Sequence, residues 1–179
     1  ITRTADIVIV EVNKNLPKVC GGYDECIHIS DVDFIVEGEH EPFPDLLPPK
    51  PTEDDILIAK HIVPYIVDGA TLQLGIGSMP NAVGELIAQS DVQDLGMHTE
   101  LCSDAYLALY KAGKLTNKKK KVDPRKGVFG CAVGSHELYK WLEKNPGIAA
   151  YPLEYVNRPS VIAEIDNMVS INSCVAVDL

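Results

Sequence analysis

Residues 71–88 read TLQLGIGSMPNAVGELIA, which predicts a strand, a glycine turn and a helix in direct succession. The strand covers Thr71–Leu74, the turn covers residues 75–78, and the helix runs over 80–88 with proline in its first turn. A strand that passes through a short turn into a helix is the repeating unit of a parallel α/β sheet, so this stretch indicates the class of fold.

The same alternation continues on both sides of this unit. Upstream, Thr52-Glu53-Asp54-Asp55 has the form of a helix cap and predicts a helix to about 68–69, in which Pro64 can introduce a kink. Downstream, we expect strands over 95–99, 128–133, 148–151 and 168–177, helices over 104–111 and 135–144, and a loop through Pro159. The sequence therefore predicts an α/β fold with a mostly parallel open sheet flanked by helices.

The first fifty residues have a different organisation. Residues 7–12 read IVIVEV, a run typical of a strand that is covered on both faces, and residues 27–29 and 34–36 are expected to form short strands. Five prolines fall within residues 42–51, which predicts an extended linker. We therefore expect 1–41 to be the end of a preceding α/β domain, 42–51 a linker, and 52–179 the first part of a second domain.

Composition excludes several classes of function. The 179 residues carry a formal net charge of −10, which disfavours nucleic-acid binding, and no apolar run approaches the roughly 18 residues of a membrane span. The five cysteines are scattered and contain no C-x-x-C pair, which argues against a disulfide framework and against a metal site, and favours a cytoplasmic location. The chain opens at Ile1 without a signal peptide and stops within an apolar alternation, so we expect a piece of a longer protein.

Two features can carry chemistry. The Gly75-Ile76-Gly77 turn can bring backbone N–H groups close to an anion or a carbonyl oxygen, although Pro80 breaks the dinucleotide-binding fingerprint and a plain tight turn explains the glycines equally well. Glu100 follows the next predicted strand and should lie at the same edge of the sheet. It can act as a base or a covalent nucleophile, or else be a solvated loop acid or a helix cap.

Several stretches, in order and across nearly the whole chain, resemble the acetyl-CoA hydrolase/CoA-transferase family, notably its butyryl-CoA:acetate and 4-hydroxybutyrate CoA-transferases. These stretches are LQLGIGSMPNAV at 72–83, LGMHTE at 95–100, SD at 103–104, TNKKK at 116–120, YVN-x-P at 155–159 and DNMV-x-INS at 166–173, with weaker likeness at 5–13 and 27–30.

The resemblance implies a ping-pong transfer of coenzyme A from a short-chain acyl-CoA to a carboxylate such as acetate. It assigns Glu100 as the nucleophile that becomes a glutamyl-CoA thioester, and Gly75, Ile76, Gly77, Ser78 and Met79 as the loop that binds CoA and supports the oxyanion. No permanently bound cofactor is implied, because CoA is a substrate. The partners implied are the acyl-CoA, the short-chain acid and, in the full-length protein, further copies of the chain.

Two departures concern acyl selectivity: Ala105 stands where many relatives have glycine, and the stretch around 88–94 is about two residues longer than in some relatives. Family members are also longer than this chain, so residues 1–179 alone are not expected to catalyse the reaction. An acyl-CoA hydrolase and a non-catalytic CoA-binding fragment remain alternatives.

Other candidates are weaker. Lys118–Lys121 could meet CoA phosphates or form a solvated loop, His98 is expected to shape the strand end beside Glu100, and Cys102 is expected to be a core residue.

Overall fold

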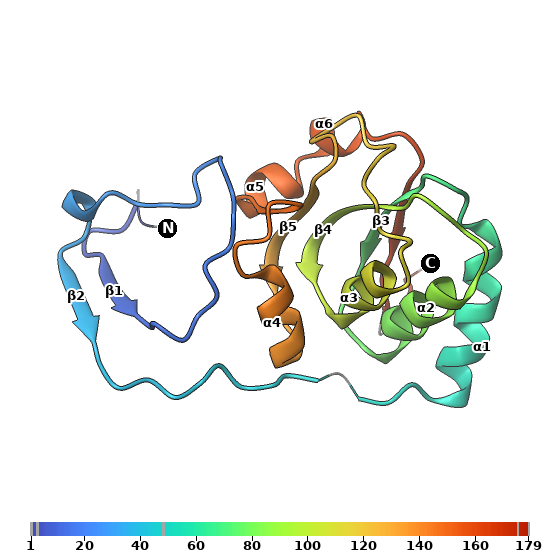
Figure 1. The fold of residues 1–179 in the computed structure, drawn as a ribbon, viewed down its shortest axis with the longest axis horizontal. Helices are drawn as coiled ribbons and strands as arrows, with labels where there is room; N and C mark the ends of the chain where they lie inside the picture. The colour runs from blue at the N-terminus through green and yellow to red at the C-terminus, as the bar shows by residue number, and fades with distance from the viewer. Residues whose placement is uncertain (1, 3, 48, 175, 179) are drawn as a thin grey trace.

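The largest part of the structure is a five-stranded parallel sheet (Figure 1). The structure is a computed structural model that describes residues 2, 4–47, 49–174 and 176–178. The strands are β3 (Thr71–Leu74), β4 (Gly96–Cys102), β5 (Gly127–Ala132), β6 (Ile148–Ala150) and β7 (Met168–Ile171), in the spatial order β6-β5-β4-β3-β7. Each neighbouring pair is parallel, which confirms the predicted fold class.

Helices cover both faces of this sheet. One layer is formed by α1 (Glu53–Ile62), α2 (Ser78–Gln89), α3 (Asp104–Lys111) and α4 (His136–Leu142), each of which packs against the next. On the other face, α5 (Leu153–Val156) packs against β4 and β5, where Val128, Ala149 and Val156 form a small buried cluster of their own. Alternate residues of the strands thus enter two different cores, as expected for a sheet buried on both sides.

The start of α1 follows the predicted cap. The hydroxyl of Thr52 accepts a bond from the Asp55 N–H at 3.1 Å, and the Asp55 carboxylate accepts one from the Thr52 N–H at 2.8 Å. The helix ends earlier than predicted, at Ile62, and continues as the 3-10 turn η2 (Val63–Tyr65). Pro64 lacks the N–H that a longer α-helix requires at this position, which accounts for the difference.

The N-terminal region forms a separate pair of strands. β1 (Ile9–Val12) and β2 (Phe34–Glu37) are parallel neighbours, but their side chains are largely exposed, 64% for Ile9 and 60% for Phe34. The prediction that this strand is covered on both faces is therefore wrong for the described chain, because no described helix or further strand packs on the pair. Residues 27–29 form no strand either; the 3-10 turn η1 covers Ile29–Asp31, with His28 accepting a bond from the Ser30 N–H.

The segment between the two sheets is extended, and it carries the residues predicted as a linker. Hydrogen bonds also join the N-terminal region to the large sheet: the Ala150 N–H donates to Cys20 O and the Lys144 N–H donates to Lys18 O, both at 2.8 Å. The predicted domain limits remain predictions.

Two further predictions were wrong in detail. The expected loop through Pro159 contains the helical turns α5 and α6 (Pro159–Ile162). The last strand ends at Ile171 rather than near residue 177, and Val175, which belongs to the predicted strand, lies outside the described residues.

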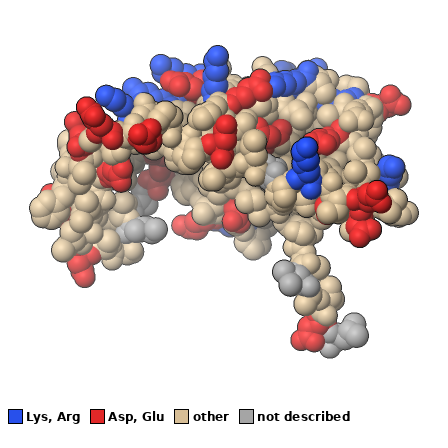
Figure 2. Space-filling model, turned by 90° about the horizontal axis from the view of Figure 1, so that it is seen from below, with Lys and Arg blue, Asp and Glu red and all other residues tan. Residues whose placement is uncertain are grey.

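Figure 2 shows that several basic side chains lie along one edge of the face it displays, and that acidic side chains are scattered across this face, including that edge. Within the described residues, no helix combines the length and apolar character needed to cross a membrane.

Candidate active site

Three neighbouring strands end around one cavity of about 320 Å³. The chain passes from β3 through β4 and β5 to β6 on one side, and then returns to place β7 on the other side of β3. Ligands of open α/β sheets bind outside the carboxyl ends of the strands where the order reverses in this way. The cavity lies there, and it is lined by Gln73, Gly75, Ile76, Glu100, Leu101 and Asn172.

Glu100 lies within β4 rather than after it, because the strand extends to Cys102. Its side chain is exposed to the cavity, and its Oε2 accepts a hydrogen bond of 2.7 Å from the side-chain amide of Asn157. Asn157 directly follows α5, so the amide comes from the opposite layer of the sandwich to α2 and α3. A carboxylate held by a single amide keeps its other oxygen free to react.

His98, two residues before Glu100 on the same strand, supports this contact. Its ring is 1% exposed, and Nε2 lies 2.8 Å from the carbonyl oxygen of Val156, the residue before Asn157. A carbonyl only accepts hydrogen bonds, so Nε2 carries the proton. Burial lowers the pKa of His98 and keeps the ring neutral. The imidazole thus holds the end of α5 at the level of Glu100.

The glycine loop is fixed to β7. The Gly75 N–H donates to Ile171 O at 2.8 Å, so this amide is already used. A side chain at residue 75 would have its Cβ only 2.7 Å from Oδ1 of Asn172, and Gly77 has a φ of +128°, which L side chains rarely adopt. The two glycines therefore permit a close approach to β7 and a sharp entry into α2.

The predicted loop residues take different positions. Gly75 and Ile76 line the Glu100 cavity, whereas Gly77 lines a neighbouring pocket. The Ser78 side chain lies near the Asp55 carboxyl, whose pKa is lowered mainly by hydrogen bonds from Thr52 and further by Ser78, and Met79 packs against the buried core. The structure thus brings Glu100 together with Gly75 and Ile76, but it directs the side chains of Ser78 and Met79 elsewhere.

An amide network beside Glu100 was missed by sequence reasoning. The Gln73 and Asn172 side chains exchange two hydrogen bonds, of 3.1 and 2.9 Å, and the Ser170 hydroxyl donates to the same Gln73 oxygen. Asn157 and Asn172 belong to stretches that carry the family resemblance, which was the only available signal, because single amides have no diagnostic spacing.

The weaker candidates lie away from the cavity or in the core. Cys102 is fully buried, and burial raises the pKa of its thiol, so it cannot act as a thiolate nucleophile. Lys120 contacts the carbonyls of Met97 and Lys126 near the amino ends of β4 and β5, at the opposite end of the strands from Glu100. Within the described part of the chain, no three His, Cys, Asp or Glu side chains could hold a metal ion together.

Two family models match this chain. Residues 1–46 match the acetyl-CoA hydrolase/transferase N-terminal domain, and residues 134–179 match the C-terminal domain of the same family. The chain belongs to the acetyl-CoA hydrolase/transferase family.

Curated relatives of this family include CoA-transferases. A probable butyrate:acetyl-CoA coenzyme A-transferase of Syntrophomonas wolfei is 48% identical over 177 residues, which cover 99% of this chain and 40% of that protein. The 4-hydroxybutyrate coenzyme A transferase of Clostridium kluyveri is 47% identical over 177 residues, which again cover 99% of this chain and 40% of that protein. The chain thus spans about 40% of the length of the curated relatives it matches.

Solved structures agree. A 4-hydroxybutyrate CoA-transferase from Porphyromonas gingivalis superposes with a TM-score of 0.88 and 40% identity, covering 98% of this chain and 44% of that one. RipA from Yersinia pestis superposes with a TM-score of 0.86 and 40% identity, covering 96% of this chain and 39% of that one. This member of the acetyl-CoA hydrolase/transferase family therefore shares its fold with CoA-transferases.

Proposed function

We propose that the protein transfers coenzyme A from a short-chain acyl-CoA to a carboxylic acid, with Glu100 as covalent nucleophile. The observation that carries this proposal is the cavity in which the Glu100 carboxylate, bonded to Asn157, faces the Gly75–Ile76 loop. The named activities of the relatives suggest butyryl-CoA or 4-hydroxybutyryl-CoA as donor and acetate as acceptor.

The reaction needs two exchanges at Glu100. A carboxylate oxygen of Glu100 attacks the thioester carbonyl, a C–O bond forms, the C–S bond breaks and CoA leaves as the thiolate. The thiolate then attacks the Glu100 carbonyl of the acyl-glutamyl anhydride, which releases the acid and leaves a glutamyl-CoA thioester. A second acid reverses both steps and departs as its own CoA thioester.

Each attack places negative charge on a former carbonyl oxygen, which needs hydrogen-bond donors beside Glu100. The Gly75 amide is taken by Ile171, whereas the N–H groups of Ile76 and Gly77 make no hydrogen bond to other described residues. We assign the Ile76 amide, which belongs to a residue that lines the Glu100 cavity, as an oxyanion donor, and the start of α2 adds partial positive charge behind it. The resemblance implies oxyanion support by the whole loop of residues 75–79, and this proposal limits that role to backbone amide donation within the loop.

We also propose a cytoplasmic location. All five cysteines are free in the structure. Unpaired thiols persist in a reducing compartment, which supports a cytoplasmic location.

Mass spectrometry tests the nucleophile. The natural full-length protein is incubated with butyryl-CoA and treated with borohydride, which reduces a glutamyl thioester to an alcohol at that residue. We expect the reduced residue at Glu100, and none in Glu100→Gln. Glu137→Gln is the matched control, because Glu137 lies on α4 in an ion pair with Lys111. An active protein with no label at Glu100 would refute the assignment, and loss of acyl-CoA without transfer to acetate would identify a hydrolase.

A further inference from the structure

A second cavity, of about 350 Å³, lies on the other side of the glycine loop and has no role in the function proposed above. It is formed where the linker crosses the carboxyl ends of β4 and β5, and none of the described residues that line it is charged. Its wall includes Leu46, Leu47, Pro49, Ile76, Ser103 and Val133, and Gly77 and Asn81 complete the lining. A mainly aliphatic cavity with a few polar groups is typical of a small-molecule site.

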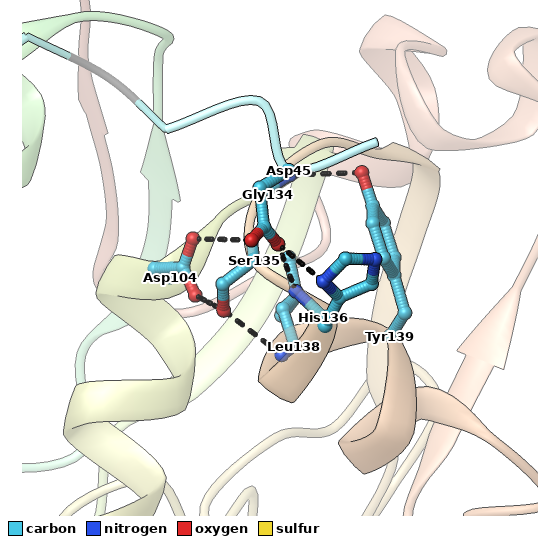
Figure 3. Close-up of polar contacts among 7 residues, drawn as sticks. All are labelled: Asp45, Asp104, Gly134, Ser135, His136, Leu138 and Tyr139. Carbon is cyan, nitrogen blue, oxygen red and sulfur yellow. Dashed lines mark hydrogen bonds and ion pairs between the residues drawn. The ribbon is translucent and has the colours of Figure 1, made fainter. Parts of the chain in front are cut away.

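The linker is fixed beside this cavity by polar contacts, and Figure 3 shows those that Asp45 makes with His136. The Asp45 carboxylate accepts a hydrogen bond of 2.6 Å from the His136 N–H and lies 3.0 Å from His136 Nδ1. The next residue, Leu46, donates its N–H to the carbonyl of Gly134 at 3.1 Å. On the same turn, Ser135 is bonded to Asp104 through both its N–H and its hydroxyl. The leucine wall of the cavity is therefore fixed by the carboxylate contacts of Asp45 and by the backbone hydrogen bond of Leu46.

The two cavities adjoin at one residue. Ile76 lines both of them, with Gly75 on the Glu100 side and Gly77 on the linker side. The Ile76 side chain is 64% exposed, so it separates the cavities without filling either. A molecule whose reacting carbon lies at Glu100 can extend past Ile76 into the linker cavity.

The residues that line the linker cavity indicate which part of an acyl-CoA thioester could bind there. The nucleotide end of CoA carries phosphates, for which the cavity offers no cation. The aliphatic acyl chain matches the leucine, isoleucine, proline and valine side chains and would be removed from water there. In addition, the hydroxyl of Ser103 is buried without a hydrogen-bond partner among the described residues, so the wall also contains an unsatisfied polar group.

We infer that the linker cavity binds the acyl chain of the thioester, and that the linker residues Leu46 and Leu47, together with Val133, set the chain length that the protein accepts. This inference rests on the proposed function at Glu100. It makes the linker a part of the substrate site as well as a connection between domains.

The test compares chain-length profiles in the natural full-length protein. Val133→Phe fills the cavity and should lower kcat/KM for hexanoyl-CoA at least about tenfold relative to acetyl-CoA, while Leu47→Ala enlarges it and should shift the profile towards longer chains. Val67→Phe adds the same volume at an exposed position outside the cavity and should leave the profile unchanged. The Leu47 variant keeps the inference testable if the Val133 variant fails to fold.

Two results would overturn the inference. One is an unchanged profile in both variants. The other is a rise in KM by the same factor for every chain length, which would place the pantetheine arm of CoA in the cavity. Saturation-transfer NMR with free hexanoate reports binding without turnover, and its signal should fall in Val133→Phe. If the wild-type protein shows this signal but no CoA transfer, the proposed function fails and only the binding of an aliphatic acid in the cavity stands.

Discussion

The side-chain amide of Asn157 donates a 2.7 Å hydrogen bond to Oε2 of Glu100, from a residue 57 positions further along the chain. The bond crosses between β4 and the end of α5, and the buried His98 ring fixes that end through Val156 O. An amide that donates to one carboxylate oxygen restricts the rotation of the side chain and leaves the other oxygen available. Asn157 is therefore a positioning residue for the proposed nucleophile.

Replacing Asn157 should slow the chemistry more than it weakens substrate binding. A hydrogen bond to a charged group contributes about 1.5–3 kcal/mol, so Asn157→Ala should lower kcat by about tenfold or more with a smaller change in KM. Asn157→Asp keeps the shape but places a second carboxylate beside Glu100, and it should be more harmful. Steady-state kinetics of the full-length protein measures both. Equal effects on every kinetic parameter, with a lowered melting temperature, would indicate a merely structural role.

Tyr106 connects α3 to the strand that leads into the glycine loop. Its buried hydroxyl accepts a hydrogen bond from the Leu74 N–H at 2.8 Å and donates one to Leu72 O at 3.1 Å. The pairing of β3 with β4 ends at Leu72, so the tyrosine hydroxyl takes the place of the hydrogen bonds that a longer pairing with β4 would provide. Tyr106→Phe leaves the buried Leu74 N–H without this partner. We expect a loss of about 1–3 kcal/mol in the free energy of unfolding, measured with urea. Tyr110→Phe, at a half-exposed tyrosine of the same helix, should change it far less.

Sequence reasoning worked best where one segment determines its own structure. The strand at 71–74 and the helix at 104–111 have the predicted limits, because alternation, glycine and helix propensity all act within a few residues. It failed where distant contacts decide: residues 7–12 look like a buried strand in any context, and their actual exposure depends on what packs against them. The residues around Glu100 divide in the same way. Gly75 was placed by its position after one strand and Glu100 by its position near the end of the next, whereas Asn157 and the linker wall reach the site only through tertiary packing.

The contact between Gly84 and Ala105 gives a physical reason for the small residues at these positions. A Cβ at residue 84 would lie 2.6 Å from the Ala105 Cβ, so α2 and α3 pack with almost no space between them. Gly84→Ala should destabilise the protein by about 1–3 kcal/mol, partly offset by a better helix propensity.

The double variant Gly84→Ala/Ala105→Gly moves the methyl group to the other helix and should recover most of this loss. A double-mutant cycle by urea unfolding measures the coupling between the two sites. Strictly additive effects would show that the loss in Gly84→Ala does not come from its contact with Ala105.

Lys120 should make the stability of the protein depend on pH in the alkaline range. The side chain is 5% exposed and donates to Met97 O and Lys126 O, and burial lowers its pKa from 10.5 to about 8. Between these two values the unfolded chain binds more protons than the folded one, so the free energy of unfolding should rise with pH across this window, by at most about 1.4 kcal/mol for each pH unit.

Buried tyrosines such as Tyr106, whose pKa is raised by burial, act in the opposite direction above about pH 10. The informative quantity is therefore the difference in unfolding free energy between the wild type and Lys120→Met, measured with urea at pH 7, 8, 9 and 10. A difference that grows with pH supports a buried, weakly basic ammonium, whereas a constant difference would mean that Lys120 keeps its ordinary pKa in the folded state.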